Sequence, residues 1–149
     1  MSDLKSVLKS AQDRARKLGL PYEGALTPAE AHLVMQAMPD AKLVDVRSRA
    51  ELDFVGRVPG STEIEFKTYP GMRPNAAFAQ QLTDRIPAGT TAMFLCRSGG
   101  RSHEAAVIAH DAGYDAYNVL EGFEGDLDPS GHRNTVGGWR AAGLPWRQS

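Results

Sequence analysis

One short segment holds the most reactive combination of residues in this chain. Residues 94–102 read FLCRSGGRS, and Cys96 is the only cysteine among 149 residues. Cys96 ends an apolar run and is followed at once by arginine, serine and glycine residues. A cysteine next to small residues and positive charges is typical of a nucleophilic thiolate. This pattern indicates covalent chemistry on an anionic substrate.

The residues after Cys96 are suited to binding an anion. Serine and glycine let the backbone fold into a tight turn whose N–H groups point inward. A helix expected to begin near Gly100 or Arg101 adds the positive end of its dipole, and together these donors favour the thiolate form of Cys96. We therefore predict Cys96 as the catalytic residue and the following loop as the substrate-binding residues: Arg97, Ser98, Gly99, Gly100, Arg101 and Ser102.

Two of these residues are arginines, whose planar guanidinium groups match oxyanions. Arg97 and Arg101 lie unfavourably against the positive end of a helix dipole, and a bound anion would offset that placement. We therefore expect both to bind the oxyanion end of the substrate. The alternative is structural, with Cys96 as a small core residue and both arginines facing solvent.

The elements around this segment alternate between strands and helices. Apolar runs predict strands over 42–46, 62–66, 91–96 and 116–120, with a weaker one near 23–26. Between or before them, periodic patterns predict helices over 3–18, 28–38, 49–56, 75–86 and 100–113. This order predicts an α/β domain with a central, mostly parallel five-stranded sheet flanked by helices. Ligands bind such sheets at the carboxyl ends of the strands, where Cys96 is expected.

Local signals mark where some helices begin. Thr27 is predicted to cap the second helix, with Pro28 at its first position and Glu30 completing a capping box. Ser2 can cap the first helix in the same way. In the tail, a short helix is expected over 137–143, and it would pack the two tryptophans, Trp139 and Trp146, against the body of the domain.

Composition excludes several classes of function. The net charge of −1 gives no support to nucleic-acid or membrane partners, and no apolar stretch approaches the roughly 20 residues of a membrane helix. A single cysteine cannot form an internal disulfide and favours a reducing, cytoplasmic location. No metal or other cofactor is expected, because the histidines have no ligand spacing. They are His32, His103, His110 and His132.

The segment CRSGGRS resembles the active-site loop of the single-domain rhodanese family. The segment LVDVRSRAELDFVGRVPGS (43–61) resembles the family's upstream signature, and GYDAYNVLEGF (113–123) resembles the part after the active-site helix. Together the similarity covers about residues 24–123. It implies a rhodanese-like fold and a sulfurtransferase that moves sulfane sulfur from a donor such as thiosulfate to cyanide or a thiol. The sulfur would be carried as a persulfide on Cys96.

The resemblance also implies supporting residues and a domain organisation. Asp45 and Arg47 are expected to brace the fold beside the loop, the alternative being a surface ion pair. Arg57 stands where the family usually has histidine and is expected to add positive charge near the mouth of the loop. We expect an N-terminal helical extension over 1–22 and a rhodanese-like domain over 23–149. An insertion near 124–136 would be either a functional lid or partner surface, or a tolerated excursion.

Three other functions stay open. Phosphatases that share this fold have five residues between cysteine and arginine, whereas four separate Cys96 from Arg101. Arsenate reduction through an internal disulfide would need a second cysteine. A non-catalytic rhodanese-like binding module would not require Cys96. The expected partners are a small sulfur-containing anion and a thiol or protein acceptor, and the sequence does not indicate an oligomeric state.

Overall fold

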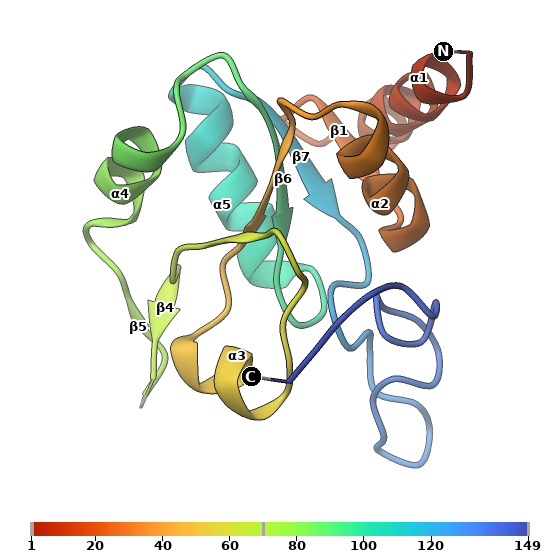
Figure 1. The fold of residues 1–149 in the computed structure, drawn as a ribbon, viewed down its shortest axis with the longest axis vertical. Coiled ribbons are helices and arrows are strands. Elements are labelled where there is room, and N and C mark those ends of the chain that lie inside the picture. Colours follow the sequence, from red (N-terminus) through yellow and green to blue (C-terminus); the bar gives the residue numbers. More distant parts are fainter. Residues whose placement is uncertain (1, 70, 149) are drawn as a thin grey trace.

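A central parallel sheet organises the molecule (Figure 1). The computed structural model describes residues 2–69 and 71–148, without the side chain of Ser2. The sheet has five strands in the order β1-β7-β6-β2-β3, and all neighbours are parallel. The bounds are β1 Gly24–Leu26, β2 Lys42–Asp45, β3 Thr62–Glu63, β6 Thr91–Leu95 and β7 Asp115–Val119. The predicted α/β class is therefore confirmed, including the weak first strand.

Helices cover both faces of this sheet (Figure 1). One core packs under α1 and α2, and the other under α4 and α5. Consecutive strand residues face opposite cores, as Leu43 and Val44 do in β2, which explains why the buried strands are apolar throughout. The remaining helix, α3, follows the carboxyl end of β2. The bounds are α1 Ser2–Leu18, α2 Pro28–Ala37, α3 Arg49–Phe54, α4 Phe78–Arg85 and α5 Gly100–Asp111.

Capping boxes begin two of the helices. The Thr27 hydroxyl accepts from Glu30 N and the Glu30 carboxylate accepts from Thr27 N, as predicted for α2. Ser48 and Glu51 form the same arrangement at α3. The predicted cap at Ser2 involves a side chain outside the described residues.

The region after β3 differs from the prediction. The expected strand 62–66 is regular only at Thr62–Glu63, although Ile64 N and Phe66 N still donate to the carbonyl oxygens of Asp45 and Val46. The chain then forms an unpredicted antiparallel pair, β4 Lys67–Thr68 and β5 Arg73–Pro74. This pair lies near α3, on the side of the molecule where the parallel strands end (Figure 1).

The predicted helix over 137–143 is wrong, because the structure has turns there. Gly138 has φ +105°, outside the helical region, and a Cβ on it would lie 2.6 Å from the backbone nitrogen of Gly125. Close contact between two backbone segments therefore replaces the expected helix. Trp139 is fully buried against the body of the domain, whereas Trp146 is 37% exposed.

None of the described helices combines the length and apolar character needed to cross a membrane.

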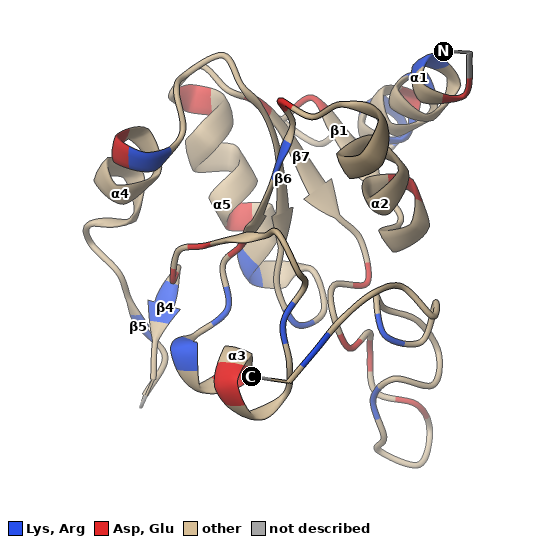
Figure 2. Ribbon diagram, viewed as in Figure 1, with Lys and Arg blue, Asp and Glu red and all other residues tan. Residues whose placement is uncertain are grey.

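Charged residues are unevenly arranged along the fold. Basic segments from several parts of the chain converge around α3 and the carboxyl ends of the strands (Figure 2). The loop that contains Cys96 lies in this region.

Candidate active site

Cys96 directly follows β6 and lies at the base of the turn that leads into α5. Its side chain is 1% exposed. The sulfur accepts a hydrogen bond from Gly99 N at 3.1 Å. The N-terminus of a twelve-residue helix follows at once, so the helix dipole adds positive potential near the sulfur. Both effects stabilise negative charge on Cys96.

The hydroxyl of Ser102 is a second polar group beside the sulfur. Ser102 is fully buried on the first turn of α5, with its oxygen 3.3 Å from Sγ and 2.6 Å from Asn118 Oδ1. A hydroxyl has one proton, so it donates to one acceptor at a time. At any moment it therefore donates either to Asn118 Oδ1 or to the Cys96 sulfur. The Asn118 amide in turn donates to Gly99 O at 3.3 Å.

Two glycines set the shape of the loop. Gly99 caps α5 with φ +112°, a conformation that residues with a Cβ rarely adopt. Gly122 packs against the loop from outside, where a Cβ would lie 2.5 Å from the carbonyl oxygen of Cys96. The next residue, Phe123, donates its N–H to that same oxygen at 2.8 Å. The segment after β7 therefore holds the loop in place.

Arg101 is paired within the protein rather than open to solvent. Its guanidinium donates to both carboxylate oxygens of Glu51, at 2.6 and 2.9 Å. Burial alone would raise the pKa of Glu51. The hydrogen bonds and charge of Arg101, with donors on Ser48, outweigh burial and hold that pKa at about 2. Arg101 therefore joins α5 to α3, and its fork is already occupied.

The other loop residues are more accessible. Arg97 is exposed, and no ion pair involves its side chain within residues 2–69 and 71–148. Its carbonyl oxygen accepts from Glu124 N and Gly125 N. Ser98 is half-buried in the bend, and Gly100 is the exposed first residue of α5. Arg97 is thus the loop arginine that is available to an incoming anion.

Asp45 and Arg47 form a fully buried pair at the end of β2, rather than a surface ion pair. Arg47 donates to Asp45 Oδ2 at 2.7 Å and to Gly56 O at 2.8 Å. Its guanidinium also lies 4.1 Å from the centre of the Phe123 ring. The pair therefore connects β2, the turn after α3 and the segment that supports the Cys96 loop.

Arg57 is paired with two carboxylates. It pairs with Asp53 at 2.6 Å and with Glu63 at 3.3 Å. Its backbone pairs with that of Arg147 near the C-terminus. Arg57 does not line the cavity described next, and two carboxylates offset its charge.

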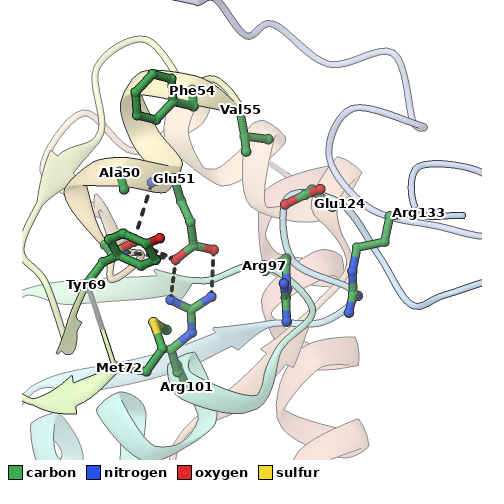
Figure 3. A pocket seen from close by; sticks show the side chains of 11 residues that line it. Ala50, Glu51, Phe54, Val55, Tyr69, Met72, Arg97, Arg101, Glu124 and Arg133 are labelled. Atoms are coloured by element: carbon green, nitrogen blue, oxygen red, sulfur yellow. Dashed lines mark hydrogen bonds and ion pairs between the residues drawn. The ribbon is translucent and has the colours of Figure 1, made fainter.

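A cavity of about 560 Å³ opens over the loop (Figure 3). The Glu51–Arg101 pair crosses its middle, with Phe54 and the following residue Val55 on one side and Arg97 and Arg133 on another. Tyr69 and Met72, from the segment around β4 and β5, extend the apolar side. The lining residues are Ser48, Ala50, Glu51, Phe54, Val55, Tyr69, Met72, Arg97, Arg101, Glu124 and Arg133.

His103 belongs to a neighbouring polar contact. Its Nδ1 lies 2.7 Å from the hydroxyl of Tyr22. Burial raises the pKa of Tyr22, and its contact with Asn118 opposes that rise. His103 thus lies on α5 beside Tyr22, which also contacts Asn118. Within the described residues, no hydrogen bond joins His103 to Cys96.

Sequence reasoning did not identify Glu51, Asn118, Gly122 or Arg133 as part of the site. A signal existed for Glu51, because Ser48 and Glu51 have capping-box spacing. Arg133 had no local signal beyond its place in the expected insertion. Asn118 and Gly122 reach the loop only through sheet pairing and the path of the chain after β7.

The fold and the site define a class of protein: an α/β domain with a cysteine at a strand-to-helix turn, where its sulfur accepts a backbone hydrogen bond beside the N-terminus of a helix. The chain matches the rhodanese-like domain family over residues 28–127. It therefore belongs to this family.

Several known proteins are similar to this chain. The crystal structure of Rv0390 from M. tuberculosis is 47% identical, with a TM-score of 0.79, covering 86% of this chain and 99% of that one. An uncharacterized protein of Rickettsia rickettsii, the RP600 homolog, is 33% identical over 79% of this chain and 92% of its own length. The polysulfide-sulfur transferase of Wolinella succinogenes is 19% identical with a TM-score of 0.59, covering 99% of this chain and 89% of that one, and this likeness shows the fold alone.

Proposed function

We propose that this protein is a sulfurtransferase. It moves sulfane sulfur from a donor such as thiosulfate to a thiophilic acceptor, cyanide or a thiol, through a persulfide on Cys96. A reducing, cytoplasmic setting would keep this cysteine available. Membership of the rhodanese-like family supports the class of chemistry.

One observation carries the proposal: the arrangement of donors around the Cys96 sulfur. Gly99 N, the Ser102 hydroxyl and the N-terminus of α5 all face it. These groups stabilise an anion on sulfur before and after a second sulfur is attached. No general base is required, because a thiolate is already the nucleophile.

In the first half-reaction, the Cys96 thiolate attacks the outer sulfur of thiosulfate. A new sulfur–sulfur bond forms to Cys96 while the one inside thiosulfate breaks. Sulfite leaves with the electron pair, so charge and atoms balance. The exposed Arg97 guanidinium is suited to bind the sulfonate oxygens as they depart.

In the second half-reaction, the acceptor attacks the outer sulfur of the persulfide. The bond to Cys96 breaks, and its electron pair returns to Cys96 as thiolate. The protein has no second cysteine to attack the persulfide and form an internal disulfide. The persulfide would therefore persist until an external acceptor reaches it.

The loop length disfavours a phosphatase. Four residues separate Cys96 from Arg101. In addition, Glu51 occupies the Arg101 fork that would hold a tetrahedral phosphate. Sulfur on the cysteine needs no such fork, because its charge lies next to the backbone donors.

Mass spectrometry of the intact protein tests the proposal directly. After incubation with thiosulfate and removal of excess reagent, the wild type should gain one sulfur atom, and cyanide should remove it with release of thiocyanate. Cys96→Ser should gain none while keeping the wild-type circular dichroism spectrum. Sulfur uptake by Cys96→Ser, or no uptake by wild type with a confirmed free thiol, would contradict the assignment to thiosulfate and Cys96.

A further inference from the structure

The cavity over the loop is much larger than the small anions considered so far. Its volume of about 560 Å³ falls within the range of about 300–1,000 Å³ that is typical of sites for organic ligands. Thiosulfate and cyanide would fill only a small part of it. The remaining space needs an explanation in terms of a larger substrate.

One wall of the cavity is apolar and accessible. Phe54, Tyr69 and Met72 are 81%, 67% and 37% exposed, and all three line the same cavity. Ala50 of α3 and Val55, which follows that helix, continue this wall (Figure 3). Large apolar side chains that gather at one concave site indicate a surface that is covered when a ligand binds.

The opposite wall is cationic. Arg97 and Arg133 line it together with Glu124 (Figure 3). Neither arginine is in an ion pair with a carboxylate within residues 2–69 and 71–148, whereas Glu51 neutralises Arg101. Among the described residues, Arg133 donates to the carbonyl oxygen of Gly125, at 2.7 Å, and to no carboxylate. Two guanidinium groups are therefore available to an anionic group.

The segment 124–136 holds Arg133 in this position. Asp128 accepts hydrogen bonds from the backbone N–H groups of Ser130 and His132 and from the Thr135 hydroxyl, which closes a compact turn. At its base, Glu124 N donates to Arg97 O at 2.9 Å. The segment that we expected to be either a lid or a surface excursion thus connects Arg133 to the Cys96 loop.

We propose, on the basis of the sulfurtransferase function, that the physiological sulfur acceptor is a small organic thiol with an apolar chain and a carboxylate or phosphate group. The chain packs against Phe54, Tyr69 and Met72, and the anion binds Arg97 and Arg133. The thiol sulfur bonds to the outer sulfur of the Cys96 persulfide as the bond to Cys96 breaks. The products are an alkyl persulfide, which retains the thiol proton, and the Cys96 thiolate.

A series of acceptors separates the effects of chain and charge. Thiosulfate is the donor, and the acceptors are 8-mercaptooctanoate, 8-mercaptooctyl phosphate, 8-mercaptooctan-1-ol, 3-mercaptopropionate and cyanide. We expect kcat/KM to be at least about tenfold higher for 8-mercaptooctanoate than for 3-mercaptopropionate, because burying methylene groups favours binding. The better of the two long anions should have a kcat/KM about tenfold higher than that of the neutral alcohol, because the alcohol cannot accept the charged hydrogen bonds. Comparing the two anions identifies the preferred group.

Two variants test whether the cationic wall causes the preference for an anion and the apolar wall causes the preference for a long chain. Arg133→Gln should reduce the advantage of the long anions over the alcohol several-fold, whereas Lys9→Gln removes the same charge from the exposed side of α1 and should not. Phe54→Ser should reduce the advantage of the long chain over the short one. Leu18→Ser, at an exposed apolar residue of α1, is its control.

The outcomes distinguish this proposal from the one on which it rests. Thiocyanate formation with equal kcat/KM for all four thiols would overturn the acceptor class and leave the sulfurtransferase intact. Sulfur transfer to a protein thiol but to none of the four thiols would do the same. If Cys96 takes up no sulfur from thiosulfate and no acceptor receives any, both proposals are contradicted. Octanoate, which has no thiol, should in addition shift amide resonances of residues 50–55 and Arg133 in Cys96→Ser, and absence of that shift would contradict the site independently of activity.

Discussion

The two arginines of the loop, only four positions apart, have different surroundings. Arg97 is exposed in the cavity, whereas both donors of the Arg101 fork are taken by Glu51. The sequence predicted the same oxyanion contact for both. In the structure Arg97 lines the cavity without an ion-pair partner among the described residues, whereas Arg101 joins α5 to α3.

Substitution of each arginine should therefore have a different effect. Arg97→Ala should raise the KM for thiosulfate about tenfold with little change in unfolding free energy, because an exposed charged contact is lost. Arg101→Ala should lower the unfolding free energy by about 2 kcal/mol, because it leaves a mostly buried carboxylate unpaired. Steady-state kinetics and urea unfolding measure the two quantities. The double variant Arg101→Ala/Glu51→Ala is the control and should recover part of the lost unfolding free energy. If Arg101→Ala instead raised the KM for thiosulfate as much as Arg97→Ala does and lost no stability, the different roles of the two arginines would be contradicted.

Helices α3 and α5 meet at their N-termini through one side chain. Glu51 completes the capping box of α3 with Ser48 and accepts both hydrogen bonds from Arg101 on α5. This carboxylate thus satisfies donors at the start of one helix and fixes the first turn of the other. Because Ser102 and Gly99 belong to that same end of α5, the position of the thiolate donors depends on the junction.

The junction predicts a pH dependence of stability. The pKa of Glu51 is lowered from 4.5 to about 2 in the folded protein. Between these values the unfolded chain binds a proton that the folded chain does not, so the unfolding free energy falls as the pH falls from about 4.5 to 2. Above about pH 4.5, the ionised Glu51 contributes up to about 3 kcal/mol to the unfolding free energy. Urea unfolding at several pH values should show a smaller decrease for Glu51→Gln than for wild type, and the same slope in both would contradict the prediction.

At the scale of the whole molecule, the C-terminal segment completes the face of the sheet that α1 and α2 cover. Trp139 is fully buried in the core with Phe123, Leu95 and Val119, and its indole N–H donates to Pro145 O at 2.7 Å. The Phe123 ring also packs against the Arg47 guanidinium, and the Phe123 N–H donates to the carbonyl oxygen of Cys96. The tail therefore stabilises the segment against which the active-site loop is built.

The two tryptophans of the tail allow a matched test of this role. Trp139→Ala should lower the unfolding free energy by about 3–5 kcal/mol, because it leaves a large cavity in the core. Trp146→Ala, at a partly exposed position, should cost about 1 kcal/mol. Urea unfolding of the two variants measures the difference, and equal losses would show that Trp139 is not the anchor.

Local patterns in the sequence were sufficient for much of the fold and for the position of Cys96. The apolar runs of the central strands predict a buried parallel sheet, and Thr27, Pro28 and Glu30 predict the start of α2, because these signals act within a few residues. For the same reason the segment CRSGGRS places a cysteine at a strand-to-helix turn. Gly99 permits the left-handed backbone that this turn requires, and the segment after β7 holds the turn in place.

Tertiary structure decided what lies around Cys96 and its loop. Glu51 meets Arg101 fifty positions away, and Arg133 reaches the cavity only through the turn that Asp128 closes. The helix expected over 137–143 is absent because Gly138 packs against the backbone of Gly125 in a conformation that no helix uses. The Glu51–Arg101 pair and the Gly138–Gly125 contact join separate segments of the chain, and the turn that Asp128 closes is connected to the Cys96 loop through Glu124 N and Arg97 O. Local propensity carries no information about such contacts, so the sequence determined the fold class and the place of Cys96 at a strand-to-helix turn, while packing determined the shape and charge of the neighbouring cavity.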